Sequence, residues 1–93
     1  MNFESGIKNI INTLNSDNSK LYPSIDLHTN KLIEKIDNCK EKTIELGNIK
    51  RSLISLRHDI LIEKKNTRED LDYYKKVYLS LISSFYRNCN MEE

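Results

Sequence analysis

The stretch that decides the fold runs from Ile25 to Ile60 and reads IDLHTNKLIEKIDNCKEKTIELGNIKRSLISLRHDI. Apolar residues recur in it at alternating steps of four and three, as the a and d positions of a coiled-coil heptad require. This pattern predicts a helix that buries a narrow stripe against other helices. The stripe residues that we expect to contact a partner are Ile25, Leu32, Ile36, Cys39, Leu46, Leu53 and Ile60.

The stripe predicts one long central helix over residues 24–65. Pro23 precedes it, and proline is tolerated only near a helix start. Such a helix would be about 60 Å long, more than a compact domain of this size needs. The alternative is a break at Gly47, where two successive steps of three interrupt the stripe and where glycine can end a helix.

Two shorter helices are expected on either side of the central one. Residues 3–15 show a helical apolar face, and Asn2 is a suitable N-cap. Thr67, followed by Glu69 and Asp70, indicates the start of a helix over residues 68–88, with a short tail at residues 89–93. We interpret residues 65–67 as a tight helical hairpin, and the alternative is uninterrupted helix through this point.

The sequence therefore predicts a single all-α domain. Its long heptad-patterned helix would pack with a short N-terminal helix and an antiparallel C-terminal helix, as a helical hairpin or three-helix coiled-coil bundle. Folded back at Asn66, the last helix reaches only to about Thr43. The half of the stripe from Ile25 to Cys39 then needs cover from the first helix or from a second chain, and we expect the partner there.

Composition narrows the classes of function. The chain has 93 residues, of which 31% are charged, and a net charge of +1, so a general nucleic-acid binder is unlikely. No apolar run is long enough for a membrane span, and the first residues do not resemble a signal peptide. We therefore expect a cytoplasmic or nuclear protein. Cys39 and Cys89 could come close enough for a disulfide, but we interpret them as small core residues.

No motif indicates catalysis, a metal site or a bound cofactor. His28 and His58 have no further ligand at metal-binding spacing, and no glycine-rich loop is present to hold phosphate. We therefore expect no enzyme. A basic strip in a segment free of acids could contact nucleic acid or an acidic partner, although we interpret it first as a solvated helix flank. This strip consists of Lys50, Arg51, Arg57 and His58.

The functional prediction is a non-enzymatic structural protein. It would be a small coiled-coil subunit of a kinetochore, cytoskeletal or tethering assembly, acting as a scaffold by helix packing with other helical subunits in a homo- or hetero-oligomer. Two alternatives stay open. One is a self-contained three-helix chaperone or binding module, and the other is a regulatory nucleic-acid-binding protein of cellular or viral origin.

Overall fold

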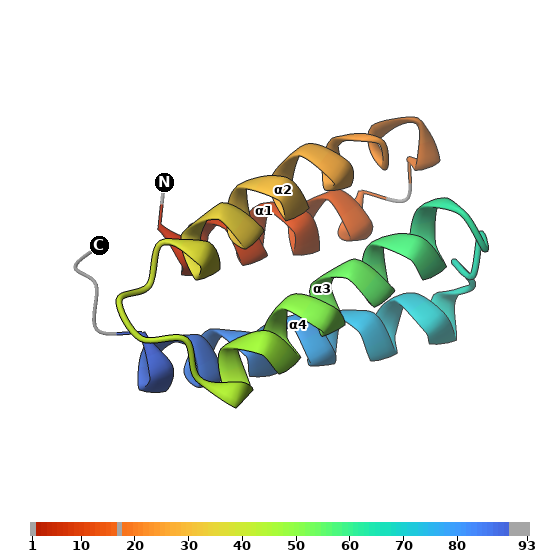
Figure 1. The fold of residues 1–93 in the computed structure, drawn as a ribbon. Helices are drawn as coiled ribbons and strands as arrows, with labels where there is room; N and C mark the ends of the chain where they lie inside the picture. The colour runs from red at the N-terminus through yellow and green to blue at the C-terminus, as the bar shows by residue number, and fades with distance from the viewer. Residues whose placement is uncertain (1, 17, 90–93) are drawn as a thin grey trace.

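Four α-helices run alternately up and down and enclose the core (Figure 1). The computed structural model describes residues 2–16 and 18–89. Each helix packs against its neighbours in sequence, and the last closes the ring against the first. The described part of the chain is thus all-helical, as expected. The helices are α1 (Phe3–Asn15), α2 (Ser24–Asp37), α3 (Ile44–Leu61) and α4 (Arg68–Asn88), with a short 3-10 helix, η1 (Ser19–Leu21), before α2.

The two ends of this bundle, which measures 36 × 22 × 18 Å, differ in what they contain. At one end lie the start of α1, the connection 38–43 between α2 and α3, and the end of α4 (Figure 1). We call it the disulfide end, because Cys39 and Cys89 are bonded there. The connections 18–23 and 62–67 lie together at the opposite end, which we call the pocket end.

The single helix expected over residues 24–65 is instead two helices. The α2 helix ends at Asp37, and α3 begins at Ile44. The break does not fall at Gly47, which lies in the first turn of α3. Local capping explains the position of the break: the Thr43 hydroxyl accepts a hydrogen bond from the Leu46 amide at 3.1 Å, which satisfies one of the free N–H groups at a helix start.

Burial explains why the break is favourable. Folding α2 back along α3 places Ile25, Leu32 and Ile36 in the core, where a continuous helix would have left them without cover. Each buried Leu or Ile side chain contributes about 1.5–3 kcal/mol, whereas each helix hydrogen bond given up costs about 1 kcal/mol. The Lys42 ammonium compensates further, because it donates to the carbonyl oxygens of Asp37 and Cys39 just past the end of α2.

The outer helices follow local sequence signals. Asn2 caps α1 by accepting from the Ser5 amide, and Thr67 caps α4 by accepting from the Asp70 amide. The α3 helix ends at Leu61, four residues before the expected position, and Lys64 rather than Asn66 adopts the left-handed backbone conformation, with φ of 57°. The chain therefore turns back toward α4 earlier than the sequence suggested.

Candidate binding site

All the stripe residues expected to contact a partner lie inside the chain's own core. The half from Ile25 to Cys39, expected to need outside cover, packs against α1 and α3. The heptad-like spacing is thus accounted for by helices of the same chain. Apart from Ile60, which lines a hollow at one end of the bundle, these side chains could be reached by another protein only by opening the bundle. The buried residues are Ile25, Leu32, Ile36, Cys39, Leu46, Leu53 and Ile60.

Two cations of the basic strip are paired with residues of α2. Lys50 binds the Asp37 carboxylate at 3.0 Å. Arg57 contacts the Asp26 carboxylate at 3.3 Å and the side-chain oxygen of Asn30 at 2.7 Å. Because Lys50 and Arg57 are seven residues apart, they lie on the same edge of α3, which faces α2.

The other two members of the strip contact residues of their own segment. Arg51 donates to the side-chain oxygen of Asn48, and His58 lies 3.4 Å from the Glu63 carboxylate. The four residues therefore divide into two pairs, one facing α2 and one contacting its own segment. The positive charge of the strip is partly offset by acids that are distant in the sequence or follow the helix, and this weakens the case for a phosphate-binding surface.

The two cysteines form a disulfide, which corrects their interpretation as free core residues. Cys39 follows α2 and Cys89 follows α4, and their Cα atoms are 5.4 Å apart. The bond joins helices at opposite corners of the ring, which share few other contacts. It therefore fixes the disulfide end in a way that pairwise packing of neighbouring helices does not.

Groups for metal or acid–base chemistry are sparse in the part of the chain that the structure describes. Within residues 2–16 and 18–89, no three His, Cys, Asp or Glu side chains come together as a metal site. Tyr78 is fully buried, and burial raises the pKa of its hydroxyl, although the charge of Arg57 acts in the opposite direction. Tyr78 therefore stays protonated in the folded protein at neutral pH.

The pocket end carries two adjoining hollows of about 450 and 460 Å³. Both are lined by Ser19, Tyr22 and Asn66, so these three residues form the boundary between them. Their volumes lie within the range of roughly 300–1,000 Å³ that is usual for ligand pockets. Of the lining residues only Ile60 was expected from the sequence to contact a partner, because the walls come from segments that meet only in the folded chain.

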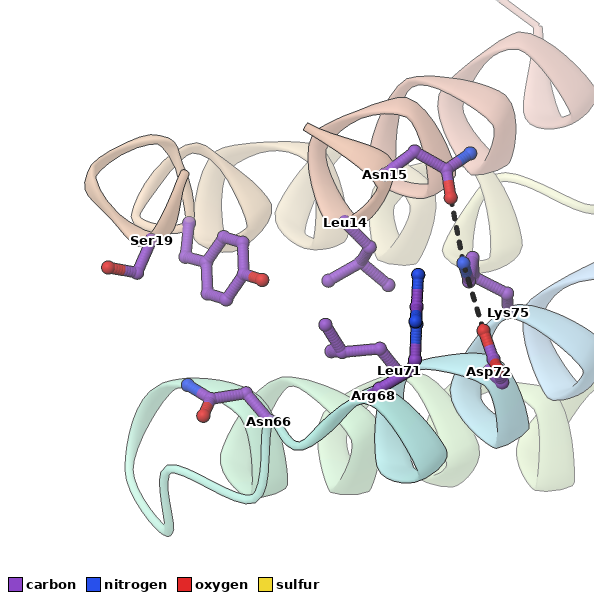
Figure 2. Close-up of a pocket in the computed structure, with 9 residues that line it drawn as sticks. Leu14, Asn15, Ser19, Asn66, Arg68, Leu71, Asp72 and Lys75 are labelled. Atoms are coloured by element: carbon purple, nitrogen blue, oxygen red, sulfur yellow. Dashed lines mark hydrogen bonds and ion pairs between the residues drawn. The ribbon is translucent and has the colours of Figure 1, made fainter. Parts of the chain in front are cut away.

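The first hollow, the polar pocket, opens between α1 and the start of α4 (Figure 2). Lys75 donates to the side-chain oxygen of Asn15 at 2.7 Å and pairs with Asp72 at 3.2 Å. Figure 2 shows Arg68 extending from α4 toward α1, beside Leu71. Among the described residues, Arg68 takes part in no ion pair, so its charge is available to a ligand.

The second hollow, the apolar pocket, lies between the start of α2 and the end of α3. Its apolar walls are Tyr22, Pro23, Ile60 and Leu61. Asp26, Lys64 and Asn66 complete the lining. Two large apolar side chains beside these walls in the sequence remain exposed, Leu21 at 48% and Ile62 at 66%.

Searches of protein-family models, of curated proteins and of solved structures found no match to this chain. In residues 2–16 and 18–89, no helix has both the length and the apolar character needed to cross a bilayer. Inference about function therefore starts from the geometry of the bundle and its pocket end.

Proposed function

We propose that the chain is a non-catalytic binding module, a self-contained helical bundle that holds a partner protein at its surface. The observation that carries this proposal is the burial of the whole heptad stripe within the chain. A core closed in this way needs no second chain to fold. The concave surface at the pocket end, whose walls combine core residues with exposed ones, is then available for recognition.

The coiled-coil subunit expected from the sequence has less support. A scaffold of the kinetochore, cytoskeletal or tethering type would need an exposed apolar stripe to bind its partner helices. The stripe residues of this chain are instead covered by its own helices. The nucleic-acid alternative has less support as well. Asp26, Asp37 and Glu63 pair with members of the basic strip, and the net charge is only +1.

The disulfide bears on where the module would work. Structural disulfides persist in oxidising compartments and are rare in the reducing cytosol and nucleus. The Cys39–Cys89 bond joins positions separated by 50 residues, so it constrains much of the chain. We therefore favour an oxidising compartment over the cytoplasmic or nuclear location suggested by composition.

Selection of peptides on the oxidised monomer tests the binding function. A phage-displayed library of random dodecapeptides is panned on immobilised protein, and the same library is panned on protein unfolded in guanidinium as the matched control. We expect recurring sequences that bind the folded protein alone and saturate at one peptide per chain. Absence of enrichment over the unfolded control would contradict the proposed function.

A further inference from the structure

We propose that the two pockets together bind a short peptide segment of the partner that carries a large apolar side chain next to a carboxylate. This inference rests on the proposed binding function and assigns its site and the chemistry of its ligand. It commits to one occupant, a segment of another protein. The argument uses the shape of the double hollow and the charges left unpaired on its walls.

The apolar pocket suits a single Leu-, Ile- or Phe-sized side chain. Tyr22, Pro23 and Leu61 line it with apolar surface from the start of α2 and the end of α3. Removing such surface from water contributes about 25 cal/mol per Å² buried. A concave pocket with apolar walls and a few polar groups is typical of binding sites.

The charged residues that line the polar and apolar pockets favour an acidic ligand. The two acids among them are already engaged, Asp26 with Arg57 and Asp72 with Lys75. The remaining cations are Lys64 in the apolar pocket and Arg68 in the polar pocket, and within the described residues neither forms an ion pair. A carboxylate held between these cations would gain charge-assisted hydrogen bonds, and Arg can offer two parallel donors.

Backbone hydrogen bonds hold the walls in place before any ligand arrives. The Lys65 amide donates to the Asp59 carbonyl at 2.9 Å, and the Asn66 amide donates to the Lys64 carbonyl at 2.9 Å. On the opposite wall, the Ile25 amide donates to the Tyr22 carbonyl at 2.8 Å. A site with ordered walls loses less conformational entropy on binding, which favours recognition of a short segment.

The test measures amide chemical shifts of the ¹⁵N-labelled full chain with three pools of octapeptides. The first pool carries Leu, Ile or Phe at its centre with Glu on both sides, the second replaces Glu by Lys, and the third replaces the apolar residue by Ser. We expect only the first pool to shift the amides of Tyr22, Leu61, Lys64, Asn66 and Arg68.

Charge reversal then tests the role of the two cations. The double variant Lys64→Glu/Arg68→Glu should bind the first pool about tenfold more weakly or worse, and should gain affinity for the lysine pool. The matched control is Lys31→Glu/Lys76→Glu, which makes the same change of charge at exposed positions outside both pockets. This control should bind the first pool as the natural chain does.

Three results of these experiments, and one of the panning, would overturn the inference. The first is that the acidic–apolar pool shifts no amide at the pocket end. The second is equal binding by the charge-reversed and natural chains. The third is a doubled mass of the free protein that the charge reversal abolishes, since a second copy would then occupy the site. Peptides selected by panning that map elsewhere on the bundle would overturn the inference and leave the proposed function standing.

Discussion

The two ends of the bundle are stabilised by different means. At the disulfide end, Cys39 is bonded to Cys89, and the rings of Phe3 and Phe85 stack with their centroids 4.0 Å apart. The Asn88 side chain bridges to the Glu45 carboxylate at 2.8 Å. Covalent, aromatic and polar contacts thus join α1, α2, α3 and α4 at this end.

Among the described residues the pocket end has no disulfide and no stacked ring pair, and polar contacts such as Lys75 with Asn15 and Arg57 with Asp26 join its helices. Its connections meet around two hollows, whereas exposed apolar side chains occur at both ends, Leu21 and Ile62 here and Ile44 at the disulfide end. Under the proposed function, the covalent cross-link lies at one end of the long axis and the binding surface at the other. Cross-links at one end allow the other to keep an open surface without loss of the core.

The largest effect is expected in the core that both ends share. Leu32→Asp places an unpaired charge at a position with 0% exposure, so it should lower the free energy of unfolding by several kcal/mol, roughly 4 or more. The measurement is chemical denaturation followed by circular dichroism. The matched control is Leu27→Asp on the outward face of α2, where the side chain is 55% exposed and the change should be about 0.5 kcal/mol or less.

Equal stability of the Leu32→Asp and Leu27→Asp variants would show that α2 does not pack against the bundle. In that case the two ends would not belong to one packed bundle, and comparing them would have no basis.

Removal of the disulfide is expected to have the next largest effect. The double variant Cys39→Ser/Cys89→Ser frees a loop of 50 residues in sequence, which corresponds to about 4 kcal/mol of chain entropy in the unfolded state. We expect a lower midpoint of thermal unfolding, and faster amide exchange at the disulfide end than at the pocket end. A reducing agent should destabilise the natural chain by a similar amount and leave the serine variant unchanged.

If reduction left the midpoint of thermal unfolding of the natural chain unchanged, the disulfide would not stabilise the bundle. Faster amide exchange confined to the pocket end would likewise contradict the prediction.

The helix caps offer a smaller test of the same comparison. Thr43→Ala at the disulfide end and Thr67→Ala at the pocket end each remove one N-cap, at a cost of about 1 kcal/mol. Thr43 also donates to the Asn88 side chain at 3.4 Å, so its loss should cost more than that of Thr67. Denaturation midpoints of the two variants show which cap contributes more stability. A larger loss of stability from Thr67→Ala than from Thr43→Ala would contradict the prediction.

The smallest effect concerns Tyr78, midway along α4 between the two ends. Its buried hydroxyl has no hydrogen-bond partner among the described residues, so Tyr78→Phe should raise the free energy of unfolding by about 1 kcal/mol at neutral pH.

The pKa of this tyrosine also predicts a pH dependence. Burial raises the pKa of Tyr78 above its ordinary value of 10.0, so the unfolded chain releases the phenolic proton at a lower pH than the folded chain. The free energy of unfolding is therefore independent of the titration of this group below about pH 10 and falls as the pH rises further. Denaturation at neutral and alkaline pH measures this fall, which should be weaker in Tyr78→Phe; an identical fall in both chains would contradict the assignment.

The sequence predicts the elements that depend on local signals. The α1 and α4 helices have periodic apolar faces next to Asn2 and Thr67, whose side chains cap the first turns. Such signals involve residues three or four apart and need no knowledge of the tertiary fold.

The break between α2 and α3 depends on contacts that local signals do not contain. Thr43 continues the stripe spacing and also makes a good N-cap, and only the burial of Ile25, Leu32 and Ile36 by α1 and α3 favours the cap. The pockets escape prediction for a similar reason. The connections 18–23 and 62–67 are far apart in the sequence and become neighbours only when the ring of helices closes.

Mass in solution tests the central claim, that the heptad stripe is satisfied within one chain. Light scattering over a dilution series of the oxidised protein, with helicity followed by circular dichroism, measures whether folding needs a second chain. We predict a mass of 11.0 kDa and a helicity that does not change on dilution. A mass of twice that value, with helicity that falls as the protein is diluted, would contradict the account.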